Sequence, residues 1–266
     1  MTASALVLFQ ASGSVVERLD PRAKATATVA LLLALITTDS LLLKAAIVAV
    51  TLVGWFAARL SGRVLAGTTA TLAFFFLTTL VLRGIVRART ATDAVALGPI
   101  LVSRSGAIDG VRMCVQILGV VLLLTLLVRS TEPTHLAEGV ELMLRPLARI
   151  GVPAHEATMM FIIALRFLPI ISREAQSMQR AQLSRGGGLV RSGVLTRARG
   201  VLPILIPLFL AALVRARDLA EAMDSRGYRG AEGRTTTRDF VLGTADRALI
   251  VLAVAVLALA VATRLA

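Results

Sequence analysis

The chain is poor in the residues from which many active sites are built. Its 266 residues include one cysteine, Cys114, and two histidines, His135 and His155, which lie far apart in the sequence. A single cysteine excludes an internal disulfide and a thiolate metal cluster. The two histidines are interpreted as solvated or hydrogen-bonded side chains, so we expect no bound metal ion and no cofactor.

Lysines and aromatic residues are also scarce. Lys24 and Lys44 are the only lysines, and neither follows a glycine, so the chain has no Walker phosphate-binding loop. No His-Glu-x-x-His or Gly-x-Ser-x-Gly sequence occurs, and aromatic residues make up 4% of the chain, too few for a base-stacking surface. We therefore expect a chain that is not an enzyme, and any ATP hydrolysis must come from another subunit.

Apolar residues and arginines are abundant. Hydrophobic residues make up 56% of the chain and the mean hydropathy is +0.81, which is typical of a polytopic membrane protein. The formal charge is +13, and all but two of the 29 basic residues are arginines. These residues lie mainly between apolar runs, so cytoplasmic loops explain them better than a nucleic-acid surface does.

The predicted fold class is all-α, with about five transmembrane helices. Four lie in an N-terminal region, residues 1–129, and one in a C-terminal region, residues 246–266. The predicted spans are 25–38, 41–58, 64–82, 111–128 and 248–262. The first two are expected to form a tight helical hairpin with Lys44 snorkelling from near its turn. With the N-terminus inside, 22 of the 29 basic residues lie on the inner side, although the arginines within 83–104 conflict locally with this orientation.

Residues 130–245 are predicted to form two or three long amphipathic helices at the cytoplasmic face or in the inner leaflet. The first is expected within 130–153, between Pro133 and Pro153, with Arg145 and Arg149 late in it.

The runs 154–171 and 201–214 are apolar enough to be spans. A full crossing of both would place Arg185 outside and Arg226 inside. We prefer long helices that lie partly in the inner leaflet, tilt at their prolines and end in the cytoplasm.

Two similar units follow one another in this region. Each begins apolar around proline, continues as a charged helix and ends at Ser-Arg-Gly, once at Ser184-Arg185-Gly186 and once at Ser225-Arg226-Gly227. Taken alone, either end is an ordinary helix terminus, because glycine caps helices and arginine complements the helix dipole. Their recurrence, each with an alanine four residues before the arginine (Ala181, Ala222), favours two tips that bind a partner. The arginine fork suits bidentate binding of a carboxylate.

A polar island precedes the first apolar run. Asp20-Pro21 predicts a helix start, with proline in the first turn. The basic residues Arg18, Arg22 and Lys24 place this end of the helix in the cytoplasm.

Arg166 lies within an apolar run, where an ionisable residue is by default a candidate functional residue. The alternative is that it snorkels or pairs with Glu156 or Glu174.

The sequence Leu19-Asp20-Pro21-Arg22-Ala23-Lys24 and the two Ala-x-x-Ser-Arg-Gly ends resemble the motifs of a known family. They are similar to the N-terminal signature and the two arginine-centred coupling motifs of the transmembrane T component of energy-coupling factor transporters, the EcfT/CbiQ family. The resemblance covers nearly the whole chain in length, span pattern and motif order. The chain departs from it at Gly186-Gly187-Gly188, where the glycines predict an unusually flexible exit from the first tip.

The resemblance implies a multi-pass subunit of an ABC-type importer in the cell membrane. It would join two cytoplasmic ATPases to a small substrate-binding membrane subunit for uptake of a vitamin or of cobalt or nickel. Arg185 and Arg226 would each dock in a groove of one ATPase, and the neighbouring small residues would shape the tips: Ser184, Gly186, Ser225 and Gly227. The alternative function is a self-contained secondary carrier, for which Arg166 and the prolines are the only hints.

Overall fold

The computed structural model describes residues 14, 16–88, 94–97, 100–144, 153–185, 194–230 and 242–265. Their contacts separate the chain into two units. One is formed by Leu8–Val140 with Phe240–Ala266, and the other contains Glu141–Asp239. The three regions predicted from the sequence, with boundaries after residues 129 and 245, stay a prediction.

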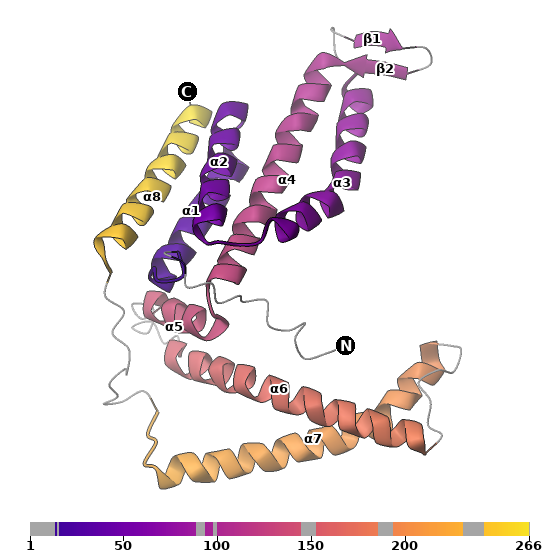
Figure 1. Cartoon of the computed structure of the whole chain (residues 1–266), viewed down its shortest axis with the longest axis vertical. Coiled ribbons are helices and arrows are strands. Elements are labelled where there is room, and N and C mark those ends of the chain that lie inside the picture. The colour runs from indigo at the N-terminus through magenta and orange to yellow at the C-terminus, as the bar shows by residue number, and fades with distance from the viewer. Residues whose placement is uncertain are drawn as a thin grey trace. The chain divides into compact units, whose positions relative to one another are not determined.

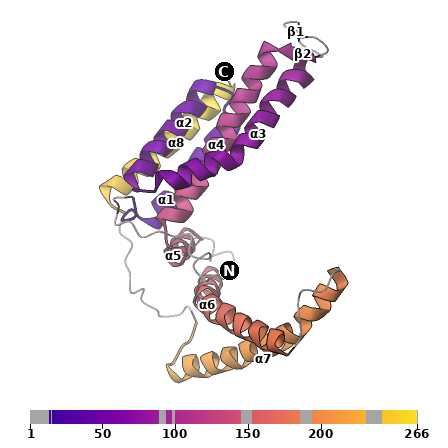
Figure 2. The same cartoon turned by 45° about the vertical axis from the view of Figure 1, so that its right-hand side comes forward.

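The first unit is a helical bundle (Figures 1 and 2). Its helices are α1 (Pro21–Thr37), α2 (Leu41–Ala57), α3 (Gly62–Ala88), α4 (Arg104–Ser130), the greater part of α5 (Pro133–Leu144) and α8 (Thr244–Leu265). Helix α1 packs against α8 and α4, and α4 also packs against α2 and α3.

A short antiparallel hairpin joins α3 to α4, formed by β1 (Ala94–Leu97) and β2 (Ile100–Ser103). The sequence predicts only a polar connection over 83–110. Helices α3 and α4 extend into this stretch from both sides.

Helix α1 begins where the sequence predicts. The Asp20 carboxylate caps the helix and accepts a hydrogen bond from the Arg22 backbone N–H at 2.8 Å, and Pro21 occupies the first turn. Proline is suited to this position because its missing N–H has no acceptor there in any case. After Thr37 a three-residue turn leads into α2, so the predicted pair of consecutive helices is present.

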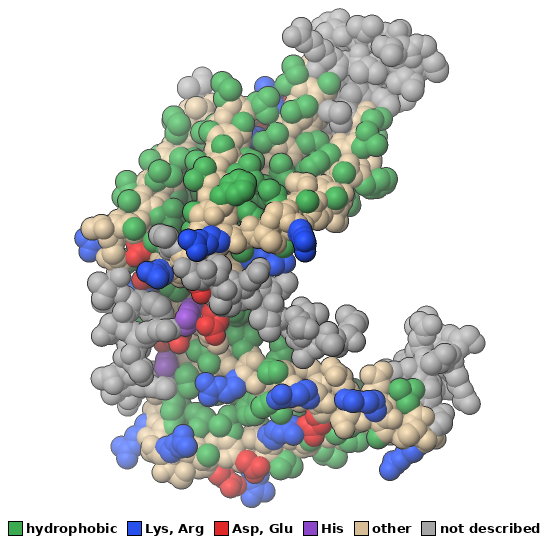
Figure 3. All heavy atoms as spheres, viewed as in Figure 1, with side chains coloured by type: hydrophobic (Ala, Val, Ile, Leu, Met, Phe, Trp, Pro, Cys, Tyr) green, Lys and Arg blue, Asp and Glu red, His purple; other side chains and the backbone are tan. Residues whose placement is uncertain are grey.

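Helix α4 packs closely on α1 and α2 at Gly119. A Cβ at this position would lie 2.9 Å from Cδ1 of Leu35 in α1 and 3.0 Å from Cγ2 of Val48 in α2. The largest fully buried apolar side chains nearby are those of Trp55, Leu35, Ile47 and Leu122. The outer surface of the bundle is also apolar, and basic side chains gather at the end where α1 begins (Figure 3). This distribution fits a bundle surrounded by lipid, with basic residues at one end.

The prediction that Lys44 snorkels towards water is wrong. Its side chain is 4% exposed, and its Nζ donates a hydrogen bond of 2.6 Å to Oε1 of Gln116 in α4. Lys44 lies on the face of α2 that packs against α4, so an amide oxygen replaces the water that snorkelling would provide.

Among the described residues, three helices are long and apolar enough to cross a membrane: α4, α6 (Ala154–Ser184) and α8. Helix α2 is a shorter apolar helix. The predicted class, an all-α membrane protein, is confirmed. The position of α6 partly within the inner leaflet stays a prediction.

The second unit consists mainly of α6 and α7 (Val194–Ser225), which cross each other (Figures 1 and 2). Their C-terminal ends lie at opposite ends of the crossed pair. Helix α7 bends in its first half, which contains Pro203 and Pro207, as expected where proline removes a backbone hydrogen bond. Helix α5 occupies part of the predicted stretch 130–153, whereas the predicted positions Arg145 and Arg149 lie outside the described residues.

Candidate functional site

The two predicted helix tips have the same serine geometry. The Ser184 hydroxyl donates a hydrogen bond of 2.9 Å to the carbonyl oxygen of Ala181. The Ser225 hydroxyl donates an equal bond of 2.9 Å to the carbonyl oxygen of Ala222. Each alanine four residues before an arginine therefore supplies the acceptor that holds the serine of its own tip.

The arginines that follow are also equivalent. The backbone N–H of Arg185 bonds the carbonyl of Gln182 at 3.2 Å, and that of Arg226 bonds the carbonyl of Met223 at 3.2 Å. Both arginine side chains are exposed. Each tip thus presents a guanidinium to solvent from a tight final turn.

The local backbone conformation accounts for glycine at position 227 of the second motif, and no binding partner has to be invoked. Its φ of +73° is left-handed, which favours glycine. Its N–H bonds the Asp224 carbonyl at 2.9 Å, and the N–H of Tyr228 bonds the Met223 carbonyl at 3.0 Å, as in a Schellman helix end. Gly186 lies outside the described residues, as do the glycines after it.

An ion pair braces the crossing of α6 and α7. Arg215 of α7 donates to the Glu174 carboxylate of α6. Arg215 also lines a hollow between the two helices, together with apolar residues that include Ile163, Phe167 and Ile171 of α6 and Ala212, Ala216 and Leu219 of α7. The polar link fixes one register of the crossing, because sliding either helix would separate the two charges.

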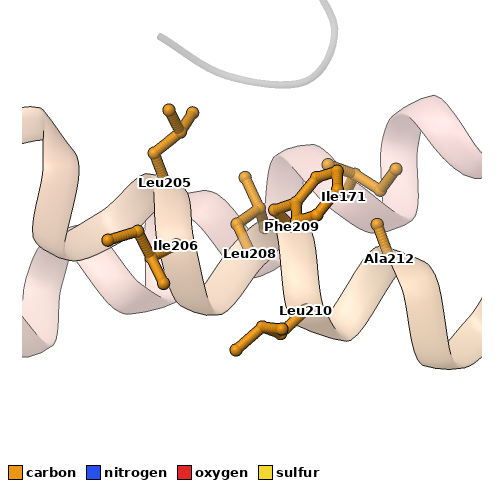
Figure 4. Close-up of a pocket in the computed structure, with 7 residues that line it drawn as sticks. All are labelled: Ile171, Leu205, Ile206, Leu208, Phe209, Leu210 and Ala212. Carbon is orange, nitrogen blue, oxygen red and sulfur yellow. The ribbon is translucent and has the colours of Figure 1, made fainter.

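An open apolar hollow of about 530 Å³ lies beside the crossing (Figure 4). It is lined by Ile171 of α6 and by the α7 residues Leu205, Ile206, Leu208, Phe209, Leu210 and Ala212. Phe209 is 66% exposed, so this surface is available to lipid or to an apolar partner.

The structure does not support the ion pairs considered for Arg166. Arg166 is exposed on α6, and Glu174 pairs with Arg215 instead. The side chain therefore lies on the surface of the helix pair.

The N-terminal signature forms a buried polar junction in the bundle. The Asp20 backbone N–H donates to Oδ1 of Asp246 in α8 at 2.9 Å, and Oδ2 of Asp246 accepts from the Gly243 N–H at 2.9 Å. Asp20 and Asp246 are each 6% exposed. The sequence analysis missed the role of Asp246. An acidic residue in the first turn of the last helix was the available signal.

Lys24 extends this junction to the end of α4. Its Nζ donates to the carbonyl oxygens of Glu17 and Ser130, each at 3.1 Å. Lys24 precedes the apolar part of α1, and its burial lowers its pKa to about 8, although the nearby Glu17, Asp246 and Asp20 act in the opposite direction. An ammonium at the last carbonyls of α4 also complements the negative end of that helix.

Neither histidine lies in a cluster of metal ligands. The described residues contain no group of three or more His, Cys, Asp or Glu side chains placed to hold a metal ion. His155 Nδ1 lies 2.8 Å from Oε1 of Glu141, and His135 Nε2 lies 3.7 Å from Oε2 of Glu132. Contacts of this kind organise helices and do not by themselves suggest catalysis.

The fold and the two tips together define an all-α membrane protein with a pair of equivalent, arginine-bearing helix ends. Residues 12–237 match the family described as cobalt transport protein, CbiQ. The chain belongs to the EcfT/CbiQ family, the transmembrane T components of energy-coupling factor transporters.

Two of the similar proteins match over nearly the full length, and a third matches over more than half of it. The energy-coupling factor transporter transmembrane protein EcfT of Acidaminococcus fermentans is 36% identical over 251 residues, covering 94% of this chain and 93% of the relative. The protein of the same name from Thermosediminibacter oceani is 34% identical over 242 residues, covering 90% and 89%. That from Bacillus subtilis is 36% identical over 155 residues, covering 58% of each chain.

Proposed function

We propose that this chain is the coupling subunit of an ABC-type importer in the cell membrane. It joins two cytoplasmic ATPases to a small substrate-binding membrane subunit, and the complex takes up a vitamin or a transition-metal ion such as cobalt or nickel. The chain itself does not catalyse ATP hydrolysis. The observation that carries this proposal is the equivalence of the Ser184-Arg185 and Ser225-Arg226 helix ends.

Two equivalent tips suit a partner that is itself present twice. Arg185 and Arg226 end separate helices, and each exposed guanidinium can bind a carboxylate in a groove with two parallel hydrogen bonds. Ser184 and Ser225 beside the arginines, and Gly227 after Arg226, keep the described part of each tip narrow. Because Arg215 and Glu174 brace the crossing, the two tips keep a set separation, as simultaneous docking on two subunits requires.

The apolar surface of α7 supports a third partner within the membrane. Leu205, Ile206 and Phe209 are each more than half exposed beside the hollow of Figure 4. A small membrane subunit could bury this surface, and displacements of the ATPases at the tips would then reach that subunit along α6 and α7.

The test is a purification of the tagged chain from its own host membranes, in wild-type form and as Arg185→Glu/Arg226→Glu. We expect the wild type to bring down two Walker-containing ATPases and a small membrane protein, and the double variant to lose the ATPases while still inserting normally. The matched control is Arg180→Glu/Arg217→Glu, which reverses two exposed arginines of the same helices before the tips and should keep them.

Retention of the ATPases by the tip variant would contradict the proposal. The secondary-carrier alternative gains support only if the wild-type chain purifies alone and, by itself in vesicles, takes up radioactive Co²⁺, Ni²⁺ or a labelled vitamin along an ion gradient.

A further inference from the structure

Helix α5 packs against the first turn of α1 at Gly139, where an added Cβ would make an unusually tight contact. A Cβ at Gly139 would lie 3.0 Å from Cβ of Pro21, 3.4 Å from the backbone nitrogen of Arg22 and 3.5 Å from the carbonyl carbon of Pro21. The two backbone atoms are at ordinary contact distance, but the Cβ of Pro21 belongs to a ring and cannot rotate away as the end of a flexible side chain could. Gly139 therefore sets how closely α5 approaches the N-terminal signature.

The same junction fixes the beginning of α5. Lys24 Nζ bonds the carbonyl oxygen of Ser130, the last residue of α4, and only Thr131 and Glu132 separate that residue from α5. Ser130 and Thr131 are 5% and 4% exposed. The signature thus holds α5 at two points, through Lys24 at its entry and through Pro21 at Gly139.

Helix α5 also carries a contact to the helices with the arginine tips. Glu141 Oε1 lies 2.8 Å from Nδ1 of His155, in the first turn of α6. Gly139 and Glu141 are two residues apart, and such residues point to different sides of a helix. The division of the chain into two units falls between residues 140 and 141, inside the continuous helix α5.

We propose that the first turn of α1 is a fixed anchor for α5 and that ATP-driven uptake depends on this anchor. This inference rests on the proposed coupling function and gives the N-terminal signature a mechanical role. Pro21, Lys24 and Gly139 are positioning residues for transport and need not touch an ATPase or the transported substrate.

The first test is Gly139→Leu in the complete complex, purified through this chain and reconstituted in vesicles. The matched control is Gly62→Leu, the same change at a helical glycine of the same unit with no heavy atom within 4 Å of the added Cβ. The readouts are the amount of bound ATPase, the rate of ATP hydrolysis, and ATP-driven uptake of radioactive Co²⁺, Ni²⁺ or a labelled B vitamin, whichever the wild type transports. We expect Gly139→Leu to keep the ATPases and hydrolysis but to lower uptake about tenfold or more, and Gly62→Leu to behave as wild type. Unchanged uptake in Gly139→Leu, or a parallel fall of all three readouts, would overturn the inference.

A second variant tests the anchor if Gly139→Leu folds poorly. In a Cys114→Ser background, Pro21→Cys/Gly139→Cys places two thiols within reach of each other, because the Cβ atoms would lie 3.0 Å apart and a small separation gives the about 3.8 Å of a disulfide. A fixed anchor predicts efficient oxidation and uptake equal to that of the reduced protein. Failure to cross-link, or loss of uptake that the reductant restores, would show that the contact is absent or has to open. Failure of the proposed function itself appears separately, as a wild-type chain that purifies without ATPases.

Discussion

The backbone N–H of Asp20 donates a hydrogen bond to Oδ1 of Asp246 at 2.9 Å, across 226 positions of sequence. The other oxygen of the same carboxylate accepts from the Gly243 N–H at 2.9 Å. One carboxylate therefore serves the N-terminal ends of both α1 and α8, where the helix dipoles also favour a negative charge. This bond ties α1 to α8.

Replacing Asp246 by asparagine should weaken that tie. One carboxylate oxygen becomes an NH₂ group, so one of the two backbone N–H donors faces another donor. We expect thermal stability in detergent to fall by an amount corresponding to about 1–3 kcal/mol. Asp218→Asn, at an exposed position on α7, is the matched control and should melt as wild type does. Equal melting of all three proteins would show that the shared carboxylate contributes no stability.

The lowered pKa of Lys24 predicts that the stability of the folded protein depends on pH. Its pKa is about 8 in the folded protein and about 10.5 when unfolded, so between these values the unfolded chain binds more protons. Stability should therefore rise as the pH increases from 8 to 10.5. Below pH 8 both states are protonated and this contribution is constant. The contribution of Lys24 is the difference in stability between wild type and Lys24→Met, measured by thermal melting at each pH. A difference that stays flat or falls between pH 8 and 10.5 would contradict a lowered pKa of Lys24.

Lys44 and Gln116 should show strong coupling in a double-mutant cycle. Gln116→Leu removes the oxygen that accepts the 2.6 Å bond from the buried ammonium, and Lys44→Met leaves the amide without its donor. Each single change should cost about 1–3 kcal/mol, whereas the double variant should cost less than the sum. Strictly additive melting shifts would mean that the two groups do not depend on each other.

The turn between α2 and α3 holds Arg59 at a φ of +52°. This left-handed conformation costs a residue with a Cβ about 1–2 kcal/mol, a penalty that glycine avoids. Arg59→Gly should therefore raise the melting temperature. The same replacement at Arg63, inside α3, should lower it because glycine weakens helices. A lower melting temperature for Arg59→Gly would indicate that the arginine side chain makes a stabilising interaction larger than the strain.

Local patterns in the sequence predicted the helices well. Asp20-Pro21 marked the start of α1 because capping and proline geometry depend on neighbouring residues alone, and the alanine, serine and arginine of each tip meet within one helical turn. The all-α membrane class could be predicted for the same reason, because long apolar runs are also a local property of the sequence.

Contacts between segments that are distant in the sequence could not be predicted from local patterns. The sequence around Lys44 favours snorkelling, and only the packing of α2 on α4 reveals Gln116 as its partner. Asp246 and Gly139 acquire their roles from α1, far away in the sequence. Neither hydrophobic periodicity nor motif spacing predicts such a contact, because it depends on how whole helices pack.

The most direct measurement is the number of ATPase subunits bound per chain, determined by native mass spectrometry of the purified complex. Two independent docking tips predict two ATPases on the wild type and on Arg180→Glu/Arg217→Glu. Fewer should remain on Arg185→Glu or Arg226→Glu alone, and none when both tips are reversed. Two ATPases on the doubly reversed, correctly inserted chain would contradict the account, and Arg185 and Arg226 would then be ordinary helix ends.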